Sequence, residues 1–143
     1  MTSIGFTGSR VGTTLDQHAA LRNVLAAHHV PEAVLRHGAC VGCDRDAHVL
    51  AWQLGYRFVI HPPVSHKLRA WMEHTEWWNR ELDVILPEKE YIERNHDIVD
   101  ESTHLIATPD GPERVRSGTW STVRYAREKG VPVTVVMPDG SIS

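Results

Sequence analysis

The sequence predicts a three-layer α/β protein in which helices cover both faces of a mainly parallel sheet of five strands. Short apolar segments alternate along the chain with longer segments of helical periodicity, and glycine or proline residues stand where the apolar segments end. Because strands joined through helices cross over to lie parallel, the helices are placed on both faces of the sheet. The chain of 143 residues has the length of one domain, and neither a linker nor a repeat divides residues 1–143.

The predicted strands are short and apolar, as buried parallel strands are. The first, SIGFT, runs into the glycine-containing turn GSRVG, and the third, RFVIH, is closed by Pro62 and Pro63. The fourth stops at Pro109. The five predicted strands are residues 3–7, 34–36, 57–61, 105–108 and 131–137.

The first predicted helix, residues 15–28, begins after a threonine that can cap it, Thr13 or Thr14. Its periodicity places Leu15, Ala19 and Leu25 among the inward positions. The other predicted helices are residues 44–54, 90–100 and 119–129.

The segment of residues 64–89 does not fit the alternation. Its tryptophans are interleaved with charged residues, and it is too long for a plain crossover loop. We expect a Trp-rich insertion that forms one helix and an irregular lid or edge. Such a cluster suits a packed satellite core or a dimer face, or one ring stacked on a base.

The composition is that of a globular protein, with 41% hydrophobic and 23% charged residues. The formal net charge of −3 argues against a dedicated polyanion binder, so nucleic acid is a possible but disfavoured partner. The sequence has neither an apolar run of the ~20 residues that cross a bilayer nor a signal-peptide pattern. Two cysteines three positions apart form a poor disulfide framework, so we expect a cytoplasmic location with no membrane partner.

Residues 36–48, RHGACVGCDRDAH, gather cysteines, histidines and carboxylates in a short stretch. A closed zinc site needs four ligands, and the Cys40–Cys43 pair has no second pair to complete it. A redox dithiol at a helix start stays an alternative, whereas packing around a tight turn is the favoured interpretation. We therefore expect no metal and no cofactor, with Asp44 capping the following helix.

Three glycine turns, GSR, GACVGCD and SGTW, each lie near the start of a predicted helix, the first two directly after a strand. A helix start offers free N–H groups and a partial positive charge, which suit phosphate or carboxylate. In parallel sheets, ligands bind at the carboxyl ends of the strands, where such loops gather. The alternative is that the glycines only make good turns.

These segments resemble known families. GSR with GACVGCDRDAH resembles the pattern G-(S/T)-R … S-G-x-x-x-G-x-D-x-x-A-H of the bacterial DNA-processing protein A family. The pair Arg94–Asn95 with SGTW resembles the R-K … G-G-x-G-T-x-x-E signature of the LONELY GUY phosphoribohydrolases. Both belong to the SLOG superfamily of Rossmann-like nucleotide-binding domains. RNHDIVD, LIATP and GTWSTVR resemble most the stand-alone YspA/YpsA-related branch, over nearly the whole chain except residues 64–89.

The resemblance implies a Rossmann-like fold that binds a nucleotide or nucleotide-derived phosphorylated ligand, as a sensor or processing protein. It also implies a homodimer or higher homo-oligomer. The residues it and the glycine turns indicate for ligand or phosphate binding are Gly8, Ser9, Arg10, Gly38, Gly42, Asp44, Arg94, Asn95, Ser117, Gly118 and Thr119.

Catalysis is uncertain because Thr122 stands where the phosphoribohydrolase signature has its catalytic glutamate. An alternative function is a nucleotide N-glycosidase with a relocated carboxylate, for which Glu93 and Asp97 are the candidates, with Asp44 as a further acid. A second alternative is a single-stranded DNA-binding protein of the DNA-processing type.

Overall fold

The computed structural model describes residues 2–143, in which six parallel strands form one sheet of order β4-β3-β2-β1-β5-β6. The strands are β1 (Ser3–Gly8), β2 (Val34–His37), β3 (Arg57–Ile60), β4 (Val84–Ile85), β5 (His104–Thr108) and β6 (Val133–Val135). The helices are α1 (Leu15–His28), α2 (Cys43–Gln53), α3 (Tyr91–Asp100) and α4 (Gly118–Glu128), with a 3-10 turn, η1 (Met72–His74). The parallel α/β architecture is confirmed, whereas the prediction of five strands was wrong.

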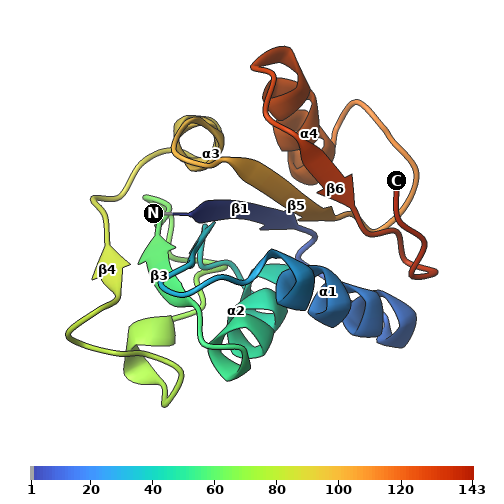
Figure 1. The fold of residues 1–143 in the computed structure, drawn as a ribbon. Helices are drawn as coiled ribbons and strands as arrows, with labels where there is room; N and C mark the ends of the chain where they lie inside the picture. Colours follow the sequence, from blue (N-terminus) through green and yellow to red (C-terminus); the bar gives the residue numbers. More distant parts are fainter. Residues whose placement is uncertain (1) are drawn as a thin grey trace.

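The helices form the two outer layers: α1 and α2 cover one face of the sheet, and α3 and α4 cover the other (Figure 1). On the first face, Leu21, Leu25 and Ala47 pack against Phe6 of the central strand. On the second, Trp120 and its neighbours on α4 pack with α3 over β5 and β6. The strand order reverses direction between β1 and β5, so the carboxyl ends of these two strands form the switch point of the sheet.

Helix α1 begins as predicted but faces differently. Thr14 caps it, and its hydroxyl accepts a hydrogen bond from Gln17 N while the Gln17 side chain reaches back to Thr14 N. The prediction that Leu15 and Ala19 face inward was wrong: Leu15 is 91% exposed, and the buried positions are Gln17, Leu21 and Leu25. Gln17 fixes this rotation because its buried amide donates to the carbonyls of Pro109 and Val136.

Helix α2 is not capped by Asp44. The N-cap is Gly42, whose φ of +89° favours glycine, and the helix begins at Cys43. The Asp44 side chain therefore starts from the second helical position and folds back over the turn, where it accepts a hydrogen bond from Cys40 N at 3.1 Å. The carboxylate therefore stabilises the glycine turn and does not cap the helix.

The Trp-rich segment forms no α-helix. Val41 N donates to Leu68 O at 2.8 Å and Ala70 N donates to Ala39 O at 2.6 Å, so the segment packs across the outside of the glycine turn. It then adds β4 to the edge of the sheet beside β3. No helix within residues 2–143 has the length and apolar character of a membrane span.

A chain of hydrogen bonds through two buried histidines joins this segment to the sheet. Ala39 N donates to His37 Nδ1 at 3.0 Å, which leaves the proton of His37 on Nε2, directed at His48 Nδ1 at 2.8 Å. His48 Nε2 in turn donates to Trp77 O at 2.6 Å. Every ring nitrogen of the two histidines has a hydrogen-bond partner when both rings are neutral. A proton added to either ring would place two N–H donors opposite each other. His48 is thus a structural residue.

Acidification should destabilise the fold through its buried histidines. Burial lowers the pKa of His48 and of His61 to about 4, from 6.5 in an unfolded chain. Between these values only the unfolded chain takes up the protons, so each histidine should remove about 1.4 kcal/mol of unfolding free energy per pH unit as pH falls. Asp44 acts in the opposite direction, because burial raises its pKa to about 6 and the folded state then gains the proton.

Urea unfolding measured from pH 7 to pH 4.5 checks this expectation. The His48→Gln variant should be less stable at pH 7 by about 1–3 kcal/mol, because it loses the hydrogen-bond chain. Its stability should nevertheless fall less steeply with acid than that of the wild type. Parallel pH profiles for the two proteins would contradict the assigned neutral state of His48.

Candidate functional site

One cavity lies at the carboxyl ends of the central strands, with a volume of 460 Å³. It opens where β1, β2 and β5 end and where α4 begins. The predicted binding residues on its wall are Gly8, Ser9, Arg10, Gly38, Asp44, Arg94, Asn95, Ser117, Gly118 and Thr119. The three glycine turns therefore converge on one space, as the sequence predicts.

Three of the glycines are required by close packing. A Cβ on Gly8 would lie 2.4 Å from Cys43 Cβ and from Thr108 Oγ1, and one on Gly38 would lie 2.2 Å from Arg94 Nη1. Gly42, which does not line the cavity, would meet Arg10 O at 2.4 Å. These glycines shape the wall of the cavity by bringing backbone and side chains together.

The Gly8→Ala variant should lose about 1–3 kcal/mol of unfolding free energy, because its methyl group overlaps two fixed neighbours. Gly111→Ala is the matched control, since a Cβ there meets nothing within 4 Å. Urea unfolding compares the two variants. Equal midpoints would show that the close approach at Gly8 carries no energetic cost.

Arg94 is the buried cation of the wall, only 5% exposed. Its Nε donates to Asn95 Oδ1 at 2.6 Å, and its Nη1 donates to the carbonyls of Gly38 at 2.8 Å and His61 at 3.1 Å. Its Nη2 donates to Cys40 Sγ at 3.6 Å. Since a guanidinium has five N–H donors, the protein itself uses four, and Arg94 acts mainly as a structural anchor with fixed positive charge.

The Arg94→Lys variant should lose roughly 2–4 kcal/mol, because an ammonium cannot span these acceptors and leaves buried carbonyls unpaired. The control is Arg116→Lys on the exposed rim of the same cavity, which should change stability by less than about 0.5 kcal/mol. Chemical denaturation measures both. A stable Arg94→Lys protein would mean that the four contacts are dispensable.

Asp44 is the buried acid of the wall, 6% exposed. Burial raises the pKa of its carboxyl group to about 6, whereas the positive charge of Arg94 and the hydrogen bond from Cys40 N oppose the rise. The carboxylate thus sits in a network with the anchoring arginine. It balances the charge of Arg94 within the protein.

Backbone donors reach the cavity from the start of α4. Ser117 caps this helix and accepts a hydrogen bond from Trp120 N at 3.2 Å. The N–H groups of Gly118 and Thr119 lie in the first turn of α4, where backbone N–H groups have no carbonyl acceptor within the helix. A Cβ on Gly118 would meet nothing within 4 Å, so this side of the cavity is open.

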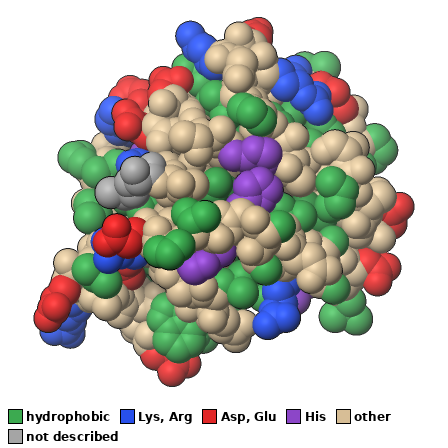
Figure 2. All heavy atoms as spheres, in the orientation of Figure 1, with side chains coloured by type: hydrophobic (Ala, Val, Ile, Leu, Met, Phe, Trp, Pro, Cys, Tyr) green, Lys and Arg blue, Asp and Glu red, His purple; other side chains and the backbone are tan. Residues whose placement is uncertain are grey.

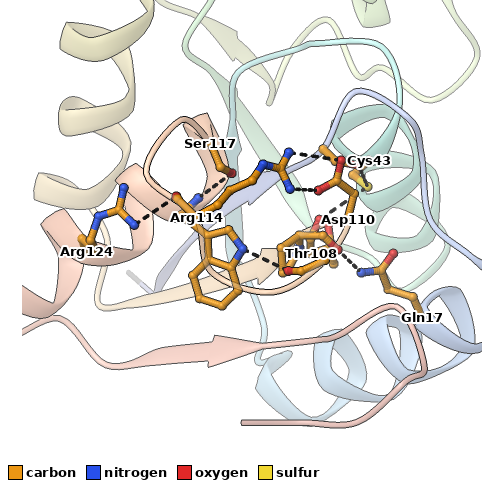
Figure 3. A network of polar contacts seen from close by, with 11 residues as sticks. Gln17, Cys43, Thr108, Asp110, Arg114, Ser117 and Arg124 are labelled. Carbon is orange, nitrogen blue, oxygen red and sulfur yellow. Dashed lines mark hydrogen bonds and ion pairs between the residues drawn. The ribbon is translucent and has the colours of Figure 1, made fainter.

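The other cations come from exposed loops, and the sequence analysis missed two of them. Arg114 and Arg116 lie in the loop before α4, and Arg114 pairs with Asp110 across the cavity wall at 2.8 Å (Figure 3). No carboxylate within residues 2–143 lies within 4 Å of the Arg10 or Arg116 guanidinium. The sequence PDGPERVRSG could have indicated these cations, because its two arginines come shortly before the start of a predicted helix.

Tyr91 was also missed, although it starts α3, the helix that carries Arg94. Its ring lines the cavity, with the Arg10 and Arg94 guanidinium groups 5.6 Å and 5.2 Å from the ring centroid. Together with Phe6 and Ile98 it gives the cavity an apolar part beside its charges.

The two predicted catalytic candidates lie elsewhere. Glu93 is exposed and faces Lys89 at 3.8 Å, and Asp97 pairs with the same lysine at 2.6 Å. Asp97 lines a smaller cavity of 260 Å³ on the other side of Arg94. Neither carboxylate is on the wall of the main cavity.

The cysteines do not form a reactive centre. Cys43 is buried in the core, Cys40 lines the cavity beside Arg94, and neither is in a disulfide. Burial raises the pKa of both thiols, which disfavours the thiolate that redox chemistry or metal binding needs. In the part of the chain that the structure describes, no three His, Cys, Asp or Glu side chains are grouped to hold a metal ion.

No protein-family model matches the sequence, and no curated protein matches it either. Solved structures do match the fold. The molybdenum cofactor binding protein from the phototrophic bacterium Rippkaea orientalis gives a TM-score of 0.66 at 20% identity, over 95% of this chain and 76% of that one. The Moco carrier protein from Chlamydomonas reinhardtii gives 0.64 at 19% identity, over 94% and 75%.

A third structure, TM1055, gives a TM-score of 0.61 at 16% identity, over 93% of this chain and 72% of that one. At these identities the likeness establishes the fold alone. The chain has a Rossmann-like, three-layer α/β fold, and its membership of the SLOG superfamily stays a prediction. Its place in the YspA/YpsA-related branch stays a prediction.

Proposed function

We propose that this protein binds a nucleotide or a nucleotide-derived phosphorylated molecule in the cavity at the carboxyl ends of β1, β2 and β5. One observation carries the proposal: free cations and the open first turn of α4 meet in one cavity of a chain whose net charge is −3. Helix starts and arginine side chains are the usual partners of phosphate in proteins.

The charge of the cavity fits one phosphate group. Its wall carries four arginines and two aspartates, so four minus two leaves a net charge of +2. Asp44 balances Arg94, and Asp110 pairs with Arg114, which leaves Arg10 and Arg116 free to meet an anion. A phosphate monoester carries about −1.5 to −2 charges at neutral pH, close to the charge that the cavity offers.

The size and lining of the cavity fit an organic ligand rather than a bare ion. Its 460 Å³ falls in the range of about 300–1,000 Å³ typical of small-molecule sites. The apolar part around Tyr91 and Ile98 suits a sugar or a ring attached to the phosphate. Two structural neighbours are described as a molybdenum cofactor binding protein and a Moco carrier protein, which supports a small-molecule ligand.

The arrangement favours binding over cleavage. Thr122, which replaces the family's glutamate, is buried, and its hydroxyl donates to Gly118 O at 2.9 Å within α4. The N-glycosidase alternative therefore depends on Asp44, the buried acid of the cavity, whose pKa lies near 6 because of burial. Free base released from nucleoside monophosphates, and lost in Asp44→Asn, would establish that alternative. A single-stranded DNA binder would instead show gel-shifts that weaken steeply with salt.

The homo-oligomer stays a prediction of the family resemblance. Exposed apolar side chains lie along the β4 edge, with Leu82 46% and Val84 47% exposed. On the face seen in Figure 2, apolar side chains are scattered among polar atoms and histidines gather near the middle, so this face has no continuous apolar patch.

A thermal-shift screen tests the proposal with nucleoside monophosphates, nucleoside diphosphates and the molybdenum cofactor. The unphosphorylated nucleosides are the matched controls. A ligand present at a hundred times its dissociation constant should add about 2.7 kcal/mol of stability. Equal shifts with phosphorylated and unphosphorylated members of a pair, or no shift with any of them, would contradict phosphate recognition.

The Gly118→Val variant should fold and lose this ligand-induced shift, because its side chain enters open space beside the first-turn N–H groups. Gly118→Ala should retain part of the shift, since its methyl group is smaller. Both variants should unfold within about 1 kcal/mol of the wild type without ligand. An undiminished shift in Gly118→Val would place the ligand away from α4.

A further inference from the structure

The cavity contains one carboxylate that an anion site does not need. Asp110 lies on the wall, and Arg114 donates from Nη1 to Oδ1 at 2.8 Å and from Nη2 to Oδ2 at 3.5 Å (Figure 3). The two side chains are 35% and 52% exposed, so a ligand entering the cavity reaches both. Arg114 holds the pKa of Asp110 below its usual value, which keeps the carboxylate charged.

The two acids of the cavity differ in how they are satisfied. Asp44 is buried and held by Cys40 N and the charge of Arg94. Within residues 2–143, Arg114 is the only side chain that donates to the Asp110 carboxylate. A carboxylate can accept about four hydrogen bonds, so Asp110 keeps acceptor capacity that faces the cavity.

The backbone around Arg114 is fixed independently of this ion pair. Arg124 of α4 donates to Glu113 Oε2 at 3.0 Å, to Arg114 O at 3.4 Å and to Val115 O at 3.3 Å. Figure 3 shows Arg124 on the opposite side of the loop from Asp110. The Arg114 side chain can therefore change partners by rotation while its loop stays anchored.

We propose that Asp110 selects phosphorylated ligands that carry a hydroxyl or amino donor near the phosphate. On binding, Arg114 turns from Asp110 to the phosphate, and the donor of the ligand takes its place on the carboxylate. A bare anion recruits Arg114 but leaves Asp110 as an unpaired like charge beside it, which weakens binding. This inference rests on the proposed function and adds a second recognised group, the hydrogen-bond donor of the ligand.

Isothermal titration calorimetry with three probes tests the inference. Adenosine 5′-monophosphate carries phosphate and ribose hydroxyls, its 2′,3′-dideoxy analogue lacks the hydroxyls, and inorganic phosphate is the bare anion. The wild type should bind the first at least about fivefold more tightly than the second, because hydrogen bonds to charged groups are strong. In Asp110→Asn this preference should fall below about twofold, and the affinity for inorganic phosphate should rise.

Glu32→Gln is the matched control, because it makes the same charge change in the exposed Arg57–Glu32 ion pair at the other end of the strands. It should bind all three probes as the wild type does. Arg114→Ala should weaken binding of all three, since the phosphate loses a cation. Its folding is checked by its unfolding midpoint.

The outcomes separate the two ideas. If the wild type binds the nucleotides and Asp110→Asn changes the three affinities equally, or keeps the hydroxyl preference, the selective role of Asp110 is wrong while phosphate binding stands. If the wild type binds none of the probes, both the proposed function and this inference fail. A loss of preference in Asp110→Asn alone supports the exchange of partners.

Discussion

The site depends on one buried guanidinium. Arg94 ties α3 to the ends of β2 and β3 through the carbonyls of Gly38 and His61, and it does so in space that only a glycine at position 38 leaves open. A buried charge needs compensation, which Asp44 supplies from the turn that the same glycine begins. The arrangement of the cavity wall therefore depends on Gly38, Arg94 and Asp44 together.

The buried and the exposed charges of the cavity have different roles. Because four of the five N–H donors of Arg94 are bonded within the protein, Arg94 contributes a fixed positive charge to the cavity. It has too few free donors to bind a ligand with two parallel hydrogen bonds. In the proposed binding mode, direct contact falls to Arg10, Arg116 and the first turn of α4, with Arg114 joining them when it leaves Asp110.

The same division underlies the proposal of binding rather than hydrolysis. A glycosidase needs a carboxylate free to meet the reacting sugar. Here Thr122, which stands at the position of the glutamate in the phosphoribohydrolase signature, bonds within its own helix. Asp110 is paired with Arg114, and Asp44 is buried and accepts a hydrogen bond from Cys40 N. The Rossmann-like fold, which this chain shares with proteins of low identity, supplies the position of the site without fixing its chemistry.

The sequence by itself determined the alternation of strands and helices, a threonine cap for the first helix and the gathering of three glycine turns at one end of the sheet. These follow from local pattern and chain crossover, whereas the structure chose Thr14 over Thr13 as the cap. Only the tertiary structure decided the sixth strand, since β4 is two residues long and is a strand through its pairing with β3. It also decided that Asp44 closes a turn, that the protein uses four of the five N–H donors of Arg94, and that Arg114 meets Asp110. The partners of Arg94 are distant in sequence, whereas those of Asp44 and Arg114 lie four residues away. In all three cases the choice depends on which donors and acceptors the packed fold leaves unpaired.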